Sequence, residues 1–307
     1  MKKRETKGLL MIIATLLMVA LFIGSGSVAY AKKGGFKHLT WQDLDNGKVV
    51  KIGAYSFKQV SGSTYFKKTK AAGAFKKAPF SITSSCTNGK VVYYIDKMEL
   101  KKYTLSSGKV SSVKKIPRSP KEDPYDPDYA NVNHVKGNNI YISRTSWGEW
   151  GFRTFIYNTK TKKLTKSFAG AISIVKGDYM LLDMKFRTDV SPAPYLLCKI
   201  SGSTLKKVKQ LSQASLGVDT VGNKFYYLEY TDKRKENGYS YYSMTAGTLY
   251  RCNVDGSKKE KLGSFKASGQ YAMVTVSKIT SKDCKLFLDG NYYRYNYKTK
   301  KKTKLAN

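Results

Sequence analysis

YRYNYKTKKKTKL, residues 293–305, is one copy of a short hairpin pattern that recurs along the chain. Each copy combines an apolar-rich strand, a tight polar turn and a basic strand. Tandem copies of one hairpin imply an array of small sheets that stack and share a core. The upstream copies open at Tyr103, Tyr157, Cys198 and Cys252.

Two further strand patterns precede each hairpin, so every unit is expected to hold four antiparallel strands. Both patterns are rich in β-branched and aromatic residues, and a turn of Gly, Asn, Asp or Lys separates them. The first strands are expected in PFSITSS (79–85), YANVNHV (129–135), GAISIVK (170–176), ASLGVDT (214–220) and YAMVTVS (271–277). The second strands are expected in KVVYYID (90–96), NNIYISR (138–144), DYMLLDM (178–184), NKFYYLEY (223–230) and CKLFLDG (284–290).

The spacing of these units predicts an all-β fold, a β-propeller of four-stranded antiparallel blades. The turn glycines Gly89, Gly137, Gly177 and Gly222 lie 48, 40 and 45 residues apart. Residues 48–80 carry the strand patterns of a degraded further unit, which makes six blades the first choice and five the alternative. A β-sandwich would not explain the repeats, and no sustained helical period occurs.

One hairpin, LYRCNVDGSKKEKL (249–262), resembles the repeat of secreted six-bladed propellers of Gram-positive bacteria. Those repeats are related in pattern to TolB-like and low-density-lipoprotein-receptor-type propellers, and the likeness covers roughly residues 80–305. The YWTD core motif of the receptor-type branch is absent, so the ligands of that branch do not carry over. The resemblance implies a non-enzymatic extracellular role in binding or scaffolding.

The start of the chain predicts export. A basic segment, Lys2–Lys7, precedes the apolar run Leu9–Ile23, and Ala29-Tyr30-Ala31 fits a signal-peptidase site. An uncleaved anchor is the alternative, although the apolar run is shorter than the roughly 20 residues of a membrane span. We expect a secreted, extracellular protein that associates with the cell wall. Its expected parts are a signal peptide at 1–31, an N-terminal linker at 32–47 and a propeller domain at 48–307.

The net charge of +35 indicates anionic partners and carries no information about the fold. Outside the cell such partners are wall polymers such as teichoic acids, acidic polysaccharides, lipid headgroups and released DNA. The export signal disfavours nucleic acid, and the aromatic residues lack the regular interleaving of a base-stacking groove. An extracellular protein or peptide is a further candidate partner, and a lysine coat that only solubilises a monomer is the competing interpretation.

The four cysteines fall in the exported part of the chain, where disulfides can form. Cys198 and Cys252 occupy matching places in consecutive repeats, and stacked sheets lie about 10 Å apart. A disulfide needs Cα atoms within about 7 Å, so this pair is expected to stay reduced. A ring of five blades would bring Cys86 beside Cys284 and permit a disulfide there. With two histidines and no CxxC, the chain predicts no metal centre and no cofactor.

Four long links are expected on one face of the propeller. Links between units emerge on the same side as links between the second and third strands of a unit, because the strands are antiparallel. Binding residues favour loops on rigid scaffolds, although a face that merely tolerates insertions is the alternative. The links are residues 116–129, 144–153, 185–194 and 231–247.

Aromatic rings beside arginines in these links suit stacking on a sugar ring or capture of a peptide. Trp147 and Trp150 lead this set, with packing at a blade edge as the competing interpretation. The ligand-binding candidates are Tyr125, Arg144, Trp147, Trp150, Arg153, Arg187, Arg234, Tyr241 and Tyr242.

A cluster of acids stands out in so basic a chain. Oxygen-rich clusters can hold Ca²⁺, which takes about six to eight oxygen ligands. The usual spacing of a calcium loop is absent and two prolines stiffen the segment, so a salt bridge with a nearby Arg or Lys is favoured. The acids are Glu122, Asp123, Asp126 and Asp128.

The sequence carries no catalytic signature. A G-x-S-x-G elbow is absent from the exported part, and serine–histidine chemistry would have to use His38 or His134. We therefore expect a non-catalytic binding or scaffolding protein at the bacterial cell envelope, held by its charge on anionic polymer. The alternative is a carbohydrate-active hydrolase or lyase with a carboxylate pair drawn from Glu149, Asp183 and Asp189.

Overall fold

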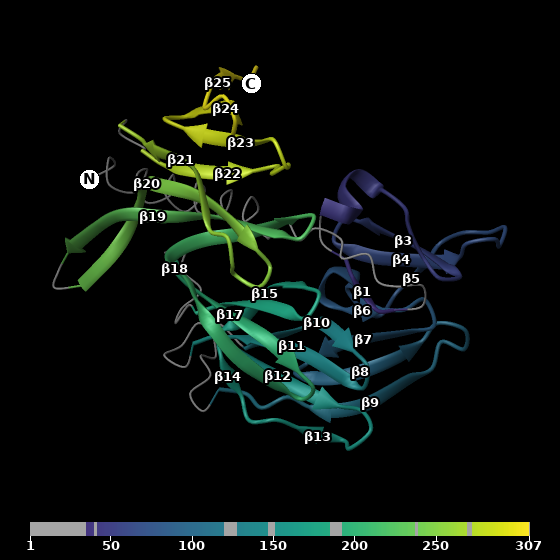
Figure 1. Cartoon of the computed structure of the whole chain (residues 1–307). Helices are drawn as coiled ribbons and strands as arrows, with labels where there is room; N and C mark the ends of the chain where they lie inside the picture. Colours follow the sequence, from purple (N-terminus) through teal and green to yellow (C-terminus); the bar gives the residue numbers. More distant parts are fainter. Residues whose placement is uncertain are drawn as a thin grey trace, which may run out of the picture. The chain divides into compact units, whose positions relative to one another are not determined.

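The structure is a computed structural model that describes residues 35–39, 42–119, 128–146, 151–184, 192–236, 239–268 and 272–306. The predicted signal segment lies outside these residues. The described chain is all-β, with five antiparallel sheets (Figure 1) and the short 3-10 helices η1 (Gln42–Gly47) and η2 (Ile82–Ser84). Nowhere in the described ranges is a helix long and apolar enough to cross a membrane. The predicted all-β class is confirmed.

The chain divides into two compact units. The N-terminal unit runs to Thr188 and also includes Tyr195–Gln210, whereas the C-terminal unit comprises Asp189–Pro194 and Leu211–Asn307. The single domain expected at 48–307 is therefore organised as two units, each with its own core.

The first sheet of the N-terminal unit is a meander of four strands and confirms the strand patterns read at 48–80. Its outer strand is short because only Phe66 and Tyr65 of the neighbouring strand pair with it. Tyr55, Phe57 and Phe66 are buried and form the centre of an aromatic cluster. The strands, in order, are β2 (Val50–Ile52), β3 (Tyr55–Val60), β4 (Ser63–Lys68) and β5 (Lys76–Lys77).

The second sheet departs from the sequence prediction at residues 79–85. These residues form η2 instead of a strand, since Ile82 donates its backbone N–H to Thr64 Oγ1 at 2.9 Å and Pro79 has no N–H to donate. The first repeat strand is therefore reduced to two residues, and a strand from the predicted linker pairs with it. The order is β1 (Lys37–His38), β6 (Cys86–Thr87), β7 (Val91–Asp96), β8 (Glu99–Thr104) and β9 (Val110–Lys115).

The segment predicted as a linker, 32–47, belongs to the folded unit where it is described. Leu39 and Leu44 have 1% and 3% of their surface exposed and pack into the same aromatic cluster as Phe66. Burial of two leucines stabilises the folded state by several kcal/mol, at about 1.5–3 kcal/mol each. Leu39 and Leu44 of this segment therefore contribute to the core.

The N-terminal unit continues with a set of five strands and a set of four, which follow the predicted ranges closely; the last strand, β18, runs on into the C-terminal unit. In the first, β14 pairs with the end of β12 beyond the short β13. The strands are β10 (Tyr129–Lys136), β11 (Asn139–Thr145), β12 (Arg153–Asn158), β13 (Lys163–Leu164) and β14 (Phe168–Ala169), followed by β15 (Ala171–Lys176), β16 (Tyr179–Asp183), β17 (Ala193–Ser201) and β18 (Thr204–Val221).

The C-terminal unit repeats the four-strand order twice. Because β18 continues past residue 210 and pairs with β19, the strands from β15 to β21 count as one sheet of seven. Six sets of four strands can thus be followed through five sheets, while the closing of a ring and the number of blades stay predictions. The remaining strands are β19 (Lys224–Glu236), β20 (Tyr239–Asn253), β21 (Glu260–Lys266), β22 (Val274–Ser277), β23 (Asp283–Leu288), β24 (Asn291–Asn296) and β25 (Lys302–Lys304).

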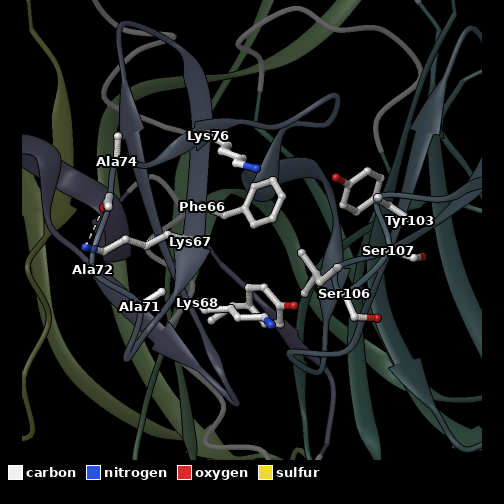
Figure 2. A pocket seen from close by; sticks show the side chains of 14 residues that line it. Phe66, Lys67, Lys68, Ala71, Ala72, Ala74, Lys76, Tyr103, Ser106 and Ser107 are labelled. Atoms are coloured by element: carbon white, nitrogen blue, oxygen red, sulfur yellow. Dashed lines mark hydrogen bonds between the residues drawn. The ribbon is translucent and has the colours of Figure 1, made fainter.

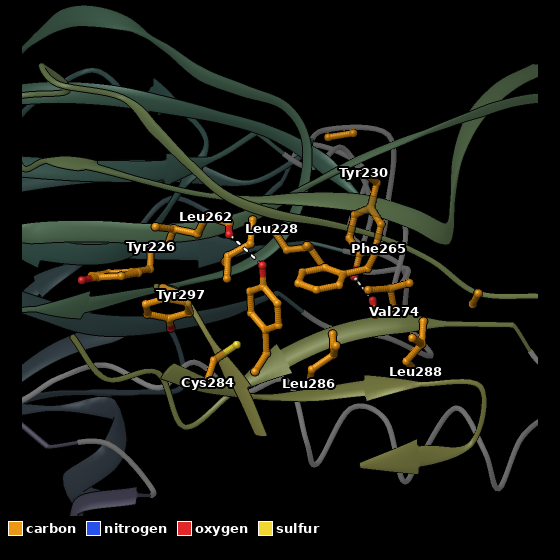
Figure 3. Packing of buried hydrophobic residues seen from close by; sticks show 14 residues of the cluster. Tyr226, Leu228, Tyr230, Leu262, Phe265, Val274, Cys284, Leu286, Leu288 and Tyr297 are labelled. Atoms are coloured by element: carbon orange, nitrogen blue, oxygen red, sulfur yellow. Dashed lines mark hydrogen bonds between the residues drawn. The ribbon is translucent and has the colours of Figure 1, made fainter. Parts of the chain in front are cut away.

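Tyrosine hydroxyls connect the two sheets of the C-terminal unit across its core. Tyr230 donates to the carbonyl of Val274 and Tyr295 to that of Leu262, each at 2.9 Å. Figure 3 shows both bonds beside Phe265, whose ring meets that of Tyr295 edge-on at 4.8 Å. The rings fill the space between the sheets, and each hydroxyl donates to a backbone carbonyl. The carbonyl of Leu262 also accepts from Nζ of Lys300 at 2.7 Å.

Candidate functional site

The structure describes part of the predicted loop face. Several predicted residues lie outside the described ranges, and their roles stay predictions. These are Tyr125, Trp147, Trp150 and Arg187 of the ligand-binding set, Glu149 and Asp189 of the carboxylates, and Glu122, Asp123 and Asp126 of the acidic cluster.

Arg144 is an interior residue, contrary to the prediction that it contacts a ligand from a loop. Its Nη1 donates to the carbonyl of Pro117 at 2.8 Å, and its Nε lies 3.8 Å from Oδ2 of Asp128. The Asp128 side chain has no exposed surface and accepts hydrogen bonds from the backbone N–H and the hydroxyl of Ser119. The prediction fails because the arginine is used to satisfy a buried carboxylate.

The same contacts decide the role of Asp128. The favoured salt-bridge role is confirmed, since Arg144 and Ser119 surround the carboxylate. The structure does not support Asp128 as a calcium ligand, because its oxygens already have buried donors. Within the described ranges, no group of three or more His, Cys, Asp or Glu side chains is placed to hold a metal ion.

The predicted link at 231–247 is a hairpin and not a loop. Its residues continue the β19–β20 ladder, in which Arg234 lies opposite Tyr241. Arg234 donates to Asp232 at 2.9 Å and to Thr245 at 3.3 Å, so its charge is partly satisfied within the hairpin. Tyr241 is 38% exposed, whereas Tyr242 packs against the C-terminal core. Of the three predicted residues, Arg234 and Tyr241 are accessible.

Arg153 is the remaining described candidate. It is half-buried and stands at the start of β12, directly opposite Arg144 on β11. The structure thus places two of the predicted arginines side by side at one end of a sheet, with Arg144 turned to the interior. Arg153 therefore remains the candidate ligand contact at this end of the sheet.

All four cysteines are buried and free. Cys86 donates to the carbonyl of Val132 at 3.6 Å, and burial raises the pKa of its thiol far above the ordinary range. The disulfide between Cys86 and Cys284 is therefore not formed in this structure. Cys198 and Cys252, which were expected to stay reduced, are likewise free and buried.

The two histidines are half-buried and lie near one another in the N-terminal unit. A ring nitrogen of His38, Nδ1, lies 3.0 Å from the carbonyl oxygen of Ser85, and burial is the main cause that lowers the pKa of His38. Burial also lowers the pKa of His134 to about 4, with smaller effects from the charges of Lys136 and His38. Both rings are neutral at pH 7. The ring of His134 packs against that of Tyr141 with centroids 5.5 Å apart and an interplanar angle of 44°.

We expect His134 to make the protein less stable in acid. The ordinary histidine pKa is 6.5 and the folded value is about 4, so between these values the unfolded chain binds more protons than the folded one. Stability is complete above pH 6.5 and falls as the pH drops toward 4, by about 2–3 kcal/mol. Replacing His134 with Phe should remove that part of the pH dependence, measured by urea unfolding at pH 7 and pH 4. An unchanged difference between the two pH values would contradict the assignment.

A pocket of about 480 Å³ opens between the first two sheets of the N-terminal unit. Its walls come from β3, β4 and β8, and its rim from the links that lead from β4 to β5 and from β8 to β9. We call it the Lys76–Tyr103 pocket (Figure 2). Its lining residues are Tyr55, Phe66, Lys67, Lys68, Ala71, Ala72, Gly73, Ala74, Lys76, Tyr103, Leu105, Ser106, Ser107 and Gly108.

Aromatic rings form the base of this pocket. Phe66 is 7% exposed and meets Tyr103 edge-on at 5.8 Å, while Tyr55 lies 6.1 Å from Phe66. Phe80 packs behind both Phe66 and Tyr103. Burial, together with the nearby Tyr55, raises the pKa of Tyr103. Its hydroxyl is therefore protonated at neutral pH and can donate a hydrogen bond.

Lysines stand at the rim. Lys76 lies opposite Phe66 in the β4–β5 ladder, and its amine ends beside the Phe66 ring in Figure 2. Lys67 extends the other way and donates to the carbonyl of Gly73 at 3.3 Å. Lys68 and Lys76 are exposed. None of the lining residues is acidic, so the pocket is positively charged.

Sequence reasoning did not predict this pocket, because it placed the candidate contacts in the four long links. A signal was present: Ala71, Ala72, Gly73 and Ala74 form a run of small residues within a lysine-rich stretch. Small side chains leave open space above an aromatic strand, and Gly73 takes a positive φ of 128° that favours glycine. The pocket is the consequence of that run.

Comparisons with known proteins assign no family. No family model and no curated protein sequence matches the chain. Among solved structures, an oligogalacturonate lyase in complex with manganese has a TM-score of 0.48 at 12% identity, over 80% of this chain and 70% of that one. The uncharacterized protein lmo1340 from Listeria monocytogenes has a TM-score of 0.45 at 14% identity, over 92% and 86%.

A third structure shows the same level of likeness. The dipeptidyl peptidase 4 of Porphyromonas gingivalis has a TM-score of 0.44 at 11% identity, and the match covers 92% of this chain and 49% of that one. These proteins include a lyase, a peptidase and a protein without a described activity. Similarity this low transfers neither substrate nor mechanism, so function has to be argued from the residues of this chain.

Proposed function

We propose that the protein is a secreted, non-catalytic binding protein of the bacterial cell envelope, held on anionic polymers by its lysines. The observation that carries the proposal is the charge: 56 Lys and Arg against 21 Asp and Glu. Within the described residues, ion pairs engage Lys101, Lys136 and Lys259. Many other lysines, of which Lys68 and Lys76 are examples, are exposed.

Such an excess favours polyanions for a physical reason. A polyanion confines counterions along its length, and a basic protein that replaces them releases these ions into solution. Binding of this kind is strong at low salt and weak at high salt, and it tolerates variation in polymer sequence. Accessible residues, Arg153 in the N-terminal unit and Arg234 and Tyr241 in the C-terminal unit, would add local selectivity.

We expect the mature protein to sediment with purified Gram-positive walls. Removal of teichoic acid from these walls should weaken the binding by at least about tenfold. Cytochrome c, a basic protein without wall-degrading activity, serves as the control for charge alone. Equal sedimentation with both wall preparations would contradict the proposal. Release of reducing sugar or unsaturated products from the walls would favour the alternative of a hydrolase or lyase.

A further inference from the structure

We propose that the Lys76–Tyr103 pocket binds one anionic sugar unit, a ring that carries a carboxylate or a phosphate group. This inference rests on the proposed function, because it takes its ligand from the same anionic polymers. It adds a defined site to a surface that otherwise acts through charge alone. Three properties of the pocket support it: its size, its aromatic base and its uncompensated lysines.

The size fits a single ring. The volume of about 480 Å³ lies within the range of roughly 300–1,000 Å³ that is typical of small-molecule sites. The pocket is bounded by two sheets of one compact unit, so strands of these sheets form its walls. Mobile ends of side chains contribute at the rim, where Lys68 and Lys76 extend.

The aromatic base suits the apolar face of a sugar. Tyr103 is only half-buried, and its edge-on contact with Phe66 at 5.8 Å holds its ring in place. A rigid ring of this kind offers contact area at little cost in conformational entropy. Its neutral hydroxyl, with the hydroxyls of Ser106 and Ser107 at the opposite rim, can exchange hydrogen bonds with ring hydroxyls.

The lysines require a negative charge on that ring. No ion pair within the described residues engages Lys68 or Lys76, and no acid lines the pocket. A neutral sugar would leave both ammonium groups without a counter-charge, whereas a carboxylate or phosphate would accept from them at the rim. Lysine acts here as a point charge, which does not by itself distinguish a carboxylate from a phosphate.

The test is isothermal titration of the mature protein with glucose 6-phosphate, glucuronic acid and glucose at physiological salt. We expect at least one of the anionic sugars to bind about tenfold or more tightly than glucose. Preference for the phosphate would identify a sugar phosphate as the natural source, and preference for the carboxylate an acidic polysaccharide. Equal binding of both anionic sugars supports the shared chemistry.

Two variants and one control locate the site. Ala72→Trp fills the pocket from an exposed position without touching the aromatic cluster, and should abolish measurable binding of the anionic sugar. Lys76→Gln should weaken it about fivefold or more, whereas Lys160→Gln, in an exposed turn elsewhere in the same unit, should change it less than twofold. Circular dichroism and the unfolding midpoint confirm that each variant is folded. Binding that survives Ala72→Trp, or absence of binding by both anionic sugars, would overturn the inference.

The inference and the proposed function fail separately. Ala72→Trp leaves the net charge unchanged, so its sedimentation with walls reports on general charge alone. Wall binding without any sugar binding would overturn the inference about the pocket and leave the proposed function intact. Sugar binding without wall binding would retain the pocket and contradict attachment by charge.

Discussion

Replacing Arg144 with Met should lower the free energy of unfolding by about 3–5 kcal/mol. The reason is that Asp128, with no exposed surface, would lose the cation whose Nε lies 3.8 Å from its Oδ2. The carbonyl of Pro117 would also lose its donor. For a buried carboxylate, the loss of this cationic neighbour costs more than the packing that methionine retains. Equilibrium urea unfolding of the wild type and the variant measures the difference.

A matched control and a double variant make this result specific. Arg153→Met changes the neighbouring arginine, which lies directly opposite Arg144 but is half-buried, and should cost less than about 1 kcal/mol. Combining Arg144→Met with Asp128→Asn removes both charges and should be less destabilising than the sum of the two single changes. Additive effects would show that the two side chains do not act as a pair, and would return Arg144 to the candidate ligand contacts.

Replacing Gly89 with Ala should destabilise the protein by about 3–5 kcal/mol. Gly89 has a φ of +79°, and an added Cβ would lie 2.8 Å from Cα of Gly53 and against the carbonyl oxygen of Ile52. Backbone atoms cannot move aside as a flexible side chain does. Two turns, one from each of the first two sheets, meet at this point, so the substitution would force these sheets apart. Thermal and urea unfolding provide the measurement.

Gly62→Ala is the control for backbone strain. Gly62 has nearly the same φ, +76°, but an added Cβ there would meet no atom within 4 Å. We expect a loss of about 1–2 kcal/mol, which is the cost of the left-handed conformation alone. Equal losses at the two glycines would mean that the close approach of the turns contributes nothing to stability.

Sequence reasoning predicted the strands best where local pattern and core packing agree. The runs 129–135, 138–144 and 284–290 became strands because β-branched and aromatic residues alternate there between glycine or asparagine turns. Residues 79–85 carry a similar pattern, yet a long-range bond from Ile82 to Thr64 turns them into a 3-10 helix. A partner 18 residues away in another sheet leaves no trace in a local window.

Long-range pairing also explains the other places where the predicted strands differ from the structure. The two-residue strand Lys37–His38 exists because it pairs with Cys86–Thr87, and neither segment has a strand pattern of its own. The segment 231–247 was expected as a long link between two strands, but its described residues extend the ladder of β19 and β20. An exposed two-stranded ladder needs no apolar face. Its cross-strand contacts, such as the hydrogen bond that Arg234 donates to Thr245, are local and satisfy polar groups.

The candidate site shows a sharper limit of sequence reasoning. An arginine in a polar link suggests a ligand contact, but Arg144 is buried beside the carboxylate of Asp128. The pairing of Arg144 with Asp128 is visible only in three dimensions. The Lys76–Tyr103 pocket joins residues of two separate repeats, so no motif within one repeat contains it. Its small-residue run, 71–74, and its lysines are readable in the sequence. Their convergence with Tyr103 is not.

The central claim is attachment by charge, and a salt titration tests it most directly. The fraction of mature protein bound to walls that carry teichoic acid would be measured between roughly 50 mM and 500 mM salt. We predict that the logarithm of the binding constant falls linearly with the logarithm of the salt concentration, with a slope of several units. A binding constant that stays unchanged across this range would contradict the account, because contacts independent of counterion release would then hold the protein on the wall.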